Sequence, residues 1–422
     1  MRLPLLQPAS SKAGSKSEGI ELGIELGDQS QGRDAKAAEK RRRLLQRKVA
    51  KKDQRHQRLL QEKADAEVRL AAAALSCSRE TISRAREQVV AQLQAEMANG
   101  QESNRFATDT KSLQFGRMKD AALGIAAYLC VDEDELYRRM GEGIEGQPGT
   151  GGLPALRREF EAKGTEKDKL CMRYVLDGEA GSCDVVFPNG NLKLDCDASG
   201  AVYSGRLLSS VGGGDGGSKG SDDDADLSSR RGWRLADFAQ HPKAKLAELS
   251  LAETAAVRLY TTAAFQSINA PLRDRARRQR KEPHPLPVTV MLISKAVSKL
   301  RAVGAEGEEA NQTVQLYRGM RNRELTDEFL ERGGSELATM STTADIGVAL
   351  SYSASSQGVL FRLSTHSSME RGADLTFLSA FPGERECLFP PLTYLQPAKP
   401  VKAETVHLGG ATFTIVSVEP KM

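Results

Sequence analysis

The chain has 422 residues, a length that corresponds to about two to four domains. Its 60 Lys and Arg against 56 Asp and Glu give a formal charge of +4, which neither indicates nor excludes a nucleic-acid-binding protein. Hydrophobic residues make up 39% and aromatic residues 5%, so part of the chain is expected to lie outside a packed core. No segment reaches the roughly 18 apolar residues of a membrane span, and no apolar signal-peptide region follows the first residues. We therefore expect a soluble, intracellular, cytoplasmic protein without a membrane partner.

The basic residues are concentrated near the N-terminus. Residues 32–70 carry 14 Lys and Arg against 6 Asp and Glu, whereas residues 233–422 carry 23 against 20. The run at 40–52 leaves a nuclear-import signal or a phosphate-binding face open as alternatives. The solvated face of a charged helix is the favoured interpretation, and a nucleic-acid partner is not expected.

The six cysteines lie far apart, without C-x-x-C spacing or neighbouring histidines. This pattern argues against a disulfide scaffold and against a zinc site. Free thiols in a reducing compartment and no bound metal are therefore predicted.

The N-terminal part is predicted to contain a disordered segment and a long helix. Residues 1–32 are rich in Gly, Ser and Lys and are expected to be disordered. Residues 33–100 are predicted to form one charged helix, because Pro and Gly are absent up to residue 99. Apolar residues recur every seven positions there, although most positions four residues later are polar; the repeat consists of Val68, Leu75, Ile82 and Val89. A coiled coil, self-association or partner binding through this helix is the resulting hypothesis.

Residues 101–210 are predicted to form a small mixed α/β module of unknown role. Helices are expected at 118–131 and 132–140, and extended segments at 170–175 and 184–203. Turn signals lie within the last of these segments. Residues 211–230 are rich in Gly, Ser and Asp, which is typical of a flexible linker.

Residues 231–422 show short helices followed by short strands. Helices are predicted at 235–238, 250–268 and 288–300. Strands are predicted in the second half, at 313–317, 359–363, 386–389, near 394 and at 411–418.

Three short segments in this part indicate chemistry. Arg318 is expected at a strand end, where a guanidinium beside Gly319 suits a phosphate group. The run 341–343 (Ser-Thr-Thr) also fits a strand followed by a helix cap, which is the structural alternative. Glu384 and Glu386 lie two residues apart where a turn enters a strand, so both carboxylates are expected on one side. Because like charges repel, a purely structural role does not favour this pair.

In this order, the three segments resemble the arginine-serine-glutamate class of mono-ADP-ribosyltransferases. Residues 259–273 are similar to the family's helical first half, and residues 375–391 to its turn-turn loop and catalytic strand. Thr343 stands where serine is commoner, which keeps the hydroxyl. The resemblance covers residues 233–418 and says nothing of residues 1–230.

The resemblance implies NAD as co-substrate. Arg318 would bind the NAD phosphates, and Gly319 would present its backbone to the nicotinamide amide. Thr342 belongs to the same binding motif. Tyr352 and Phe361 fall where an aromatic residue often contacts nicotinamide, but a core position is favoured for Phe361.

The resemblance also implies three catalytic residues. Ser341 would hold the nicotinamide ribose and orient Glu386. Glu386 would accept a hydrogen bond from the ribose 2′-hydroxyl and stabilise the positive charge that develops as nicotinamide leaves. Glu384 would bind and help deprotonate an acceptor guanidinium, which is a poor nucleophile without a base.

The sequence thus predicts an α+β chain whose C-terminal domain has a helical lobe beside a split antiparallel sheet, preceded by the long helix and the mixed module. The predicted reaction transfers ADP-ribose from NAD to an exposed arginine of a protein acceptor and releases nicotinamide. NAD hydrolysis with water as acceptor is one alternative. A scaffold with an inactive transferase-like domain is another.

Overall fold

The structure, a computed structural model, consists of two compact units formed by residues 1–63 and 64–422, which are described separately. Most of the segment expected to be disordered and the whole predicted linker lie outside the described residues. The described residues are 28–98, 110–116, 124–178, 195–197, 200–202, 233–304 and 312–422.

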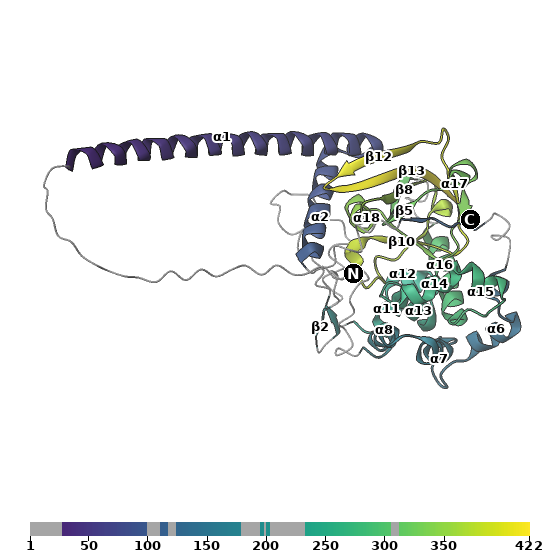
Figure 1. Cartoon of the computed structure of the whole chain (residues 1–422). Helices are drawn as coiled ribbons and strands as arrows, with labels where there is room; N and C mark the ends of the chain where they lie inside the picture. Colours follow the sequence, from purple (N-terminus) through teal and green to yellow (C-terminus); the bar gives the residue numbers. More distant parts are fainter. Residues whose placement is uncertain are drawn as a thin grey trace, which may run out of the picture. The chain divides into compact units, whose positions relative to one another are not determined.

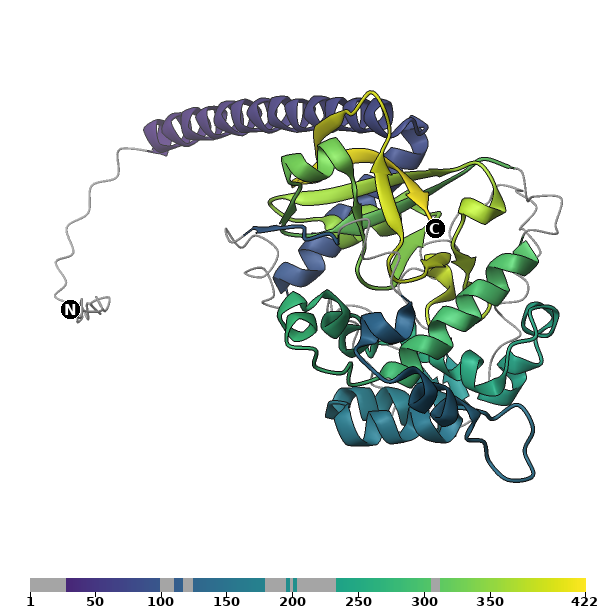
Figure 2. The ribbon, with the colours of Figure 1, turned by 90° about the vertical axis from the view of Figure 1, so that its right-hand side faces the viewer.

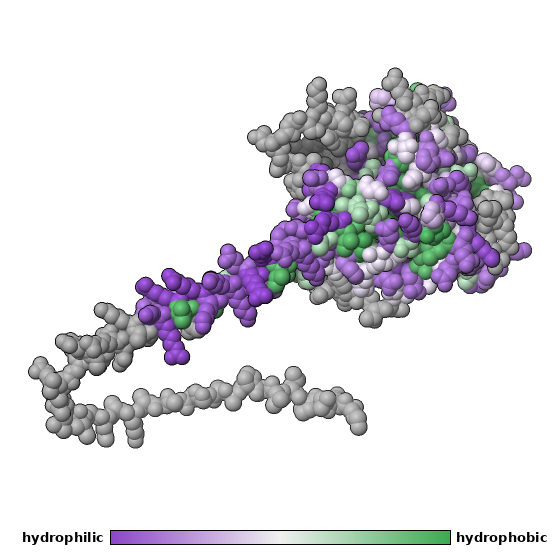
Figure 3. Space-filling model, turned by 90° about the horizontal axis from the view of Figure 1, so that it is seen from above, coloured by the Kyte–Doolittle hydropathy of each residue, from purple (hydrophilic) through white to green (hydrophobic). Residues whose placement is uncertain are grey.

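The described part of the first unit is helical. Helix α1 (Asp28–Leu75) begins before residue 33, where the helix was expected to start. The described side chains of residues 39–63 are all exposed, and Figure 3 shows this stretch as largely hydrophilic with isolated hydrophobic residues. Ion pairs at i and i+4 join Arg43 to Glu39 and Arg58 to Glu62, both at 2.9 Å. Such pairs support a solvated helix by a few tenths of a kcal/mol each.

The prediction of one continuous helix over 33–100 is wrong, because α1 ends at Leu75 and a second helix, α2 (Arg79–Ala98), follows. Ser76 has a φ of 54°, a left-handed conformation that ends the first helix without Gly or Pro. The Ser78 hydroxyl accepts a hydrogen bond from the Thr81 N–H at 3.2 Å and caps the second helix.

The seven-residue repeat packs within the chain instead of forming a coiled coil. Leu75, Ile82 and Val89 are fully buried in one hydrophobic cluster with Leu350 and Phe413. The contacts run from α2 to helix α18 (Ile346–Ser353) and to the strands beside it. Figure 1 shows α2 alongside α18. The repeat is therefore the buried helical face of residues 68–89 within the second unit.

The helical lobe of the second unit combines segments from both sides of the predicted linker. Figures 1 and 2 show these helices gathered on one side of the strands. They are α5 (Ile125–Leu129), α6 (Glu133–Gly141), α7 (Leu153–Lys163), α8 (Glu166–Asp177), α11 (Leu235–Ala239), α12 (Pro242–Leu246), α13 (Leu251–Tyr260), α14 (Phe265–Arg273), α15 (Arg275–Gln279) and α16 (Pro287–Gly304).

Residues 124–178 are not a separate module. Their buried side chains belong to the same hydrophobic cluster as those of residues 235–300. The Tyr128 hydroxyl lies 2.7 and 2.8 Å from the carbonyl oxygens of Leu272 and Leu337. This part of the predicted module is thus built into the helical lobe.

The structure contradicts one of the two extended segments predicted in the module and contains strands in the other. The extended segment expected at 170–175 is wrong, because these residues lie in α8. A reciprocal capping box between Thr165 and Asp168 starts this helix, and its buried residues follow helical spacing. Strands β2 (Asp195–Asp197) and β3 (Gly200–Val202) pair antiparallel within the segment expected to be extended at 184–203, whose other residues lie outside the described residues.

The sheet of the second unit has nine strands in the order β6-β11-β13-β8-β4-β7-β10-β9, with β12 paired to β13. All neighbours are antiparallel except β8 and β13, which run parallel, so the predicted antiparallel sheet is present with one parallel pair in it. The strands are β4 (Val314–Met320), β6 (Gly334–Ser335), β7 (Met340–Thr343), β8 (Gly358–Thr365), β9 (Ala373–Asp374), β10 (Glu386–Phe389), β11 (Tyr394–Pro397), β12 (Ala403–Leu408) and β13 (Ala411–Lys421).

Short elements connect or flank these strands. Strand β1 pairs in parallel with β5 beside the main sheet. These elements are β1 (Lys111–Ser112), β5 (Arg323–Glu324), α17 (Asp327–Arg332), η3 (Ser368–Glu370) and η4 (Pro382–Glu384).

Apolar side chains cover both faces of the sheet. On β8, Leu360 belongs to the cluster that includes α2, whereas its neighbour Phe361 belongs to a cluster with Phe329 and Phe389. Successive side chains of a strand point to opposite faces, so the two clusters lie on opposite sides. Phe361 is therefore a core residue, as favoured from the sequence. No helix among the described residues is long and apolar enough to cross a membrane.

Candidate active site

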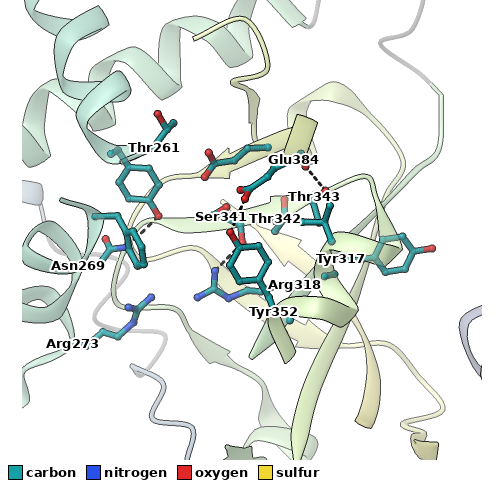
Figure 4. Close-up of a pocket in the computed structure, with 16 residues that line it drawn as sticks. Thr261, Asn269, Arg273, Tyr317, Arg318, Ser341, Thr342, Thr343, Tyr352 and Glu384 are labelled. Atoms are coloured by element: carbon teal, nitrogen blue, oxygen red, sulfur yellow. Dashed lines mark hydrogen bonds between the residues drawn. The ribbon is translucent and has the colours of Figure 1, made fainter. Parts of the chain in front are cut away.

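A cavity of about 200 Å³ lies where helices α13 and α14 approach strands β4, β7 and β10. Figure 4 shows Asn269 and Arg273 on its helical side and Ser341, Thr342 and Arg318 on its strand side. The structure brings all the predicted site residues to this cavity: Arg318, Gly319, Ser341, Thr342, Tyr352, Glu384 and Glu386.

The order of the central strands explains this gathering. Strand β7 lies between β4 and β10, and Thr343 is paired with Tyr317 on one side and Glu386 on the other. Residues far apart in the chain therefore reach one end of the sheet. Arg318 lies within β4 and not at its end, because the strand continues to Met320.

The two glutamates reach the cavity from different local structures. Glu384 ends the 3₁₀ turn η4, Arg385 takes a left-handed conformation with φ 47°, and Glu386 begins β10. The Tyr352 hydroxyl donates a hydrogen bond of 2.6 Å to Glu384 Oε1. The Thr343 hydroxyl donates one of 2.5 Å to the Glu384 carbonyl oxygen. These bonds fix the turn that carries Glu384.

Burial raises the pKa values of both carboxyl groups. It raises the pKa of Glu386 to about 7, while the hydrogen bond from Ser341 and the charge of Arg318 act in the opposite direction. It raises the pKa of Glu384 to about 8 against the effect of the Tyr352 hydrogen bond, and the nearby Glu386 raises it further. Proton affinities near neutrality are suited to acid–base and charge-stabilising roles.

Arg318 is held on one side and has a free donor on another. Its Nη1 donates to the Ser341 carbonyl oxygen at 2.8 Å, and its Nη2 lies 3.4 Å from Glu336 Oε2. Its Nε is buried and has no hydrogen-bond partner among the described protein atoms. A guanidinium in this state can bind an anionic oxygen atom without first breaking an internal bond.

A second polar group faces the cavity from the helical lobe. Asn269 Nδ2 donates to the Tyr260 hydroxyl at 3.1 Å and to the Thr339 carbonyl oxygen at 3.2 Å. Asn269 Oδ1 is buried and lacks a partner among the described protein atoms. Arg273, one helical turn later, also lines the cavity. The helical lobe thus contributes ligand-binding groups of its own.

Comparison with known proteins places this segment in a family. The model of the ADP-ribosyltransferase exoenzyme family matches residues 233–396. The matched segment contains every residue that lines the cavity. The C-terminal part of the chain is an ADP-ribosyltransferase-like domain. No curated protein is significantly similar to the chain.

Bacterial proteins are among the solved structures to which this chain is similar. Plx2a, a toxin from Paenibacillus larvae, is 17% identical, with a TM-score of 0.32, over 44% of this chain and 95% of that one. HopU1 of Pseudomonas syringae is 19% identical, with a TM-score of 0.31, over 44% and 85%. Exoenzyme S of Pseudomonas aeruginosa is 22% identical, with a TM-score of 0.29, over 46% and 88%. These similarities are too distant to assign a substrate or partner to this chain.

Two predicted site residues of the ADP-ribosyltransferase domain also have structural roles. A Cβ atom on Gly319 would lie 1.9 Å from the Ala349 carbonyl oxygen, so α18 can pack on β4 only beside a glycine. The Thr342 hydroxyl donates to the Cys387 carbonyl oxygen at 2.8 Å and joins β7 to β10. Both residues shape the cavity wall through the fold.

Several residues of the domain's cavity region escaped the sequence prediction. Tyr260, Asn269 and Arg273 lie in segments that carried the family resemblance, but no role was given to them. Glu336 lies between β6 and β7 and had no sequence signal, because its partners come from distant elements. No group of three or more potential metal ligands occurs among the described residues.

Proposed function

We propose that this protein is a mono-ADP-ribosyltransferase that transfers ADP-ribose from NAD to arginine side chains of proteins and releases nicotinamide. The observation that carries the proposal is the shared cavity of Arg318, Ser341, Glu384 and Glu386. One guanidinium for phosphate and two carboxyl groups for a developing cation and an acceptor match the chemistry of this reaction.

NAD is the co-substrate in this proposal. Arg318 binds its phosphates through the unpartnered Nε, and Gly319 and Thr342 form the strand wall beside it. Tyr352 contributes an aromatic wall and holds Glu384. Because charge–charge interactions are stronger where apolar walls exclude water, this cavity suits an anionic ligand next to a cationic centre.

Glu386 acts on the reacting ribose. Ser341 donates a hydrogen bond to Glu386 and fixes the carboxylate. When the bond between ribose C1′ and the nicotinamide nitrogen breaks, its electron pair neutralises the pyridinium. Positive charge develops on the ribose, where the Glu386 carboxylate stabilises it. The burial that raises the pKa of Glu386 also strengthens this interaction.

Glu384 acts on the acceptor. A guanidinium nitrogen of the protein arginine forms the new bond to C1′, and the proton it loses passes to the Glu384 carboxylate. The raised pKa of Glu384, about 8, makes the carboxylate a stronger base than an exposed one. The second glutamate therefore favours an arginine acceptor over water.

The exposed stretch of α1 at residues 39–63 is the part of the helical region available to a partner. The repeat of Leu75, Ile82 and Val89 is not available, because it is buried in the second unit. Sedimentation of the full-length protein tests self-association through this stretch.

The decisive experiment incubates the purified full-length protein with NAD labelled in the adenylate and with agmatine. We expect labelled ADP-ribosyl-agmatine and free nicotinamide. Glu386→Gln should lower nicotinamide release by about 100-fold or more, which is typical of a lost electrostatic contact in a transition state. Glu384→Gln should suppress transfer to agmatine and retain hydrolysis of NAD.

Glu404→Gln is the matched control, because Glu404 is exposed on β12 away from the cavity. It should retain wild-type activity. Nicotinamide release without any modified agmatine or protein arginine would identify a NAD glycohydrolase instead. Equal inactivity of wild type and Glu386→Gln would favour the scaffold alternative.

A further inference from the structure

Glu336 is a buried carboxylate that faces two arginines of the cavity wall. It is 7% exposed and lies in the connection between β6 and β7. Its Oε1 accepts a hydrogen bond from Arg273 Nε at 3.0 Å, and its Oε2 lies 3.4 Å from Arg318 Nη2. Arg273 belongs to the helical lobe and Arg318 to the sheet. A single carboxylate thus joins the two sides of the cavity.

The backbone around Glu336 is fixed independently of its side chain. The Glu336 N–H donates to the Thr393 carbonyl oxygen, and the Leu392 N–H donates to the Glu336 carbonyl oxygen, both at 2.8 Å. The Ala338 N–H donates to Oε1 at 3.1 Å. The Glu336 carboxylate therefore has a fixed position, and it determines where the Arg273 and Arg318 guanidinium groups can pair with it.

The charges indicate what this position achieves. Burial by itself would raise the pKa of Glu336, but the Arg273 and Arg318 guanidinium groups hold it below the ordinary glutamate value. Glu336 is therefore an anion that compensates two neighbouring cations. Without it the two guanidinium groups would repel each other, and Arg318 would be free to pair with Glu386, whose pKa it already influences.

We propose that Glu336 is a positioning residue, which holds Arg273 and Arg318 together at the cavity wall as one binding site for the NAD phosphates and keeps Arg318 away from Glu386. This inference rests on the proposed NAD chemistry. It adds a residue outside the arginine, serine and glutamate segments. Glu336 itself touches neither the reacting ribose nor the leaving group in this proposal.

The test measures nicotinamide release by full-length Glu336→Gln over a range of NAD concentrations and of pH. We expect the KM for NAD to rise about tenfold or more, as for loss of a charge-assisted contact. We also expect the acidic limb of the rate profile to move to lower pH, because an uncompensated Arg318 stabilises the Glu386 carboxylate. Glu336→Asp keeps the negative charge, so its KM for NAD and the position of its acidic limb should lie between those of wild type and Glu336→Gln.

Glu253→Gln is the matched control for a buried glutamate in an ion pair. Glu253 is 4% exposed and pairs with Lys299 at 2.7 Å, and it does not line the cavity. Its loss should reduce stability and the active fraction and leave KM and the pH limb unchanged. If Glu336→Gln behaves in the same way, Glu336 is only structural and the inference is wrong. If Glu336→Gln does not fold, Glu336→Asp becomes the test. Its shorter side chain should give a KM for NAD and a pH limb that both differ from wild type, and wild-type values for both would overturn the inference.

Calorimetric titration of NAD separates this inference from the proposed function. If the wild-type protein binds NAD without releasing nicotinamide, only the proposed reaction is contradicted. The NAD affinity of Glu336→Gln then tests the inference: weaker binding than wild type supports it, and equal binding overturns it. A wild-type protein that does not bind NAD overturns both.

Discussion

Two neighbouring stretches of the N-terminal helices have similar residues in opposite surroundings. In α1, Val49 is 58% exposed and Glu62 pairs with Arg58 in water. After residue 63, within the second unit, Val89 is fully buried and Glu67 accepts a hydrogen bond from the Gly409 backbone N–H. Charge and composition therefore do not distinguish a solvated helix from one that packs against a sheet. The difference is that residues 71–93 have the apolar surface of α18 and the sheet to pack against, whereas the side chains of residues 39–63 are exposed.

The largest expected effect is a matched pair of valine substitutions. Val89→Asp places a carboxylate in the cluster that joins α2 to the sheet, and we expect it to lower the free energy of unfolding by about 4 kcal/mol. Val49→Asp should change it by less than about 0.5 kcal/mol. Urea unfolding of both full-length variants measures the difference. Equal effects would show that α2 is not docked.

A second prediction concerns the pH dependence of stability. The pKa of Glu386 is about 7 in the folded protein and near 4.5 when unfolded, so the folded state holds the proton more tightly. Stability is therefore lost as pH rises from about 4.5 through 7. Glu386→Gln has no proton to lose at this position. Its free energy of unfolding, relative to that of wild type, should therefore increase by on the order of 2–3 kcal/mol between pH 4 and pH 8.

Thermal unfolding of wild type and Glu386→Gln at several pH values measures this gain. Glu39→Gln, on the exposed stretch of α1, supplies the contrast and should follow the wild-type pH profile. A constant difference between wild type and Glu386→Gln across this range would contradict a buried, proton-binding Glu386.

The smallest expected effect is a matched pair of glutamate substitutions. Glu67 accepts a hydrogen bond from the Gly409 N–H at 3.1 Å and lies 3.5 Å from Arg86 Nε. Glu67→Gln should cost about 1 kcal/mol, whereas Glu62→Gln should cost about 0.3 kcal/mol or less. Denaturant midpoints compare the two variants. A larger cost for Glu62→Gln would mean that the exposed stretch has contacts of its own.

The sequence could identify the arginine, serine and glutamate segments of the cavity because each lies in or beside a short strand and they follow a recognisable order. It could not identify Glu336, whose partners Arg273 and Arg318 are 63 and 18 residues away. The end of α1 was missed because Ser76 adopts a left-handed conformation that Gly or Asn would have signalled more clearly. The parallel pairing of β8 and β13 depends on tertiary topology, which strand patterns do not contain.

The docking of α2 has a consequence for where the enzyme can be divided. The family match begins at residue 233, yet Leu350 and Phe413 within the sheet region are covered by side chains from residues 71–93. Arg362 of β8 also donates to the Ala74 carbonyl oxygen at 3.0 Å. A fragment cut at the family boundary would expose this apolar surface to aggregation. A separately made peptide of residues 64–98 should bind that fragment in trans and cover this surface, although the fragment would still lack residues 124–178 of the helical lobe.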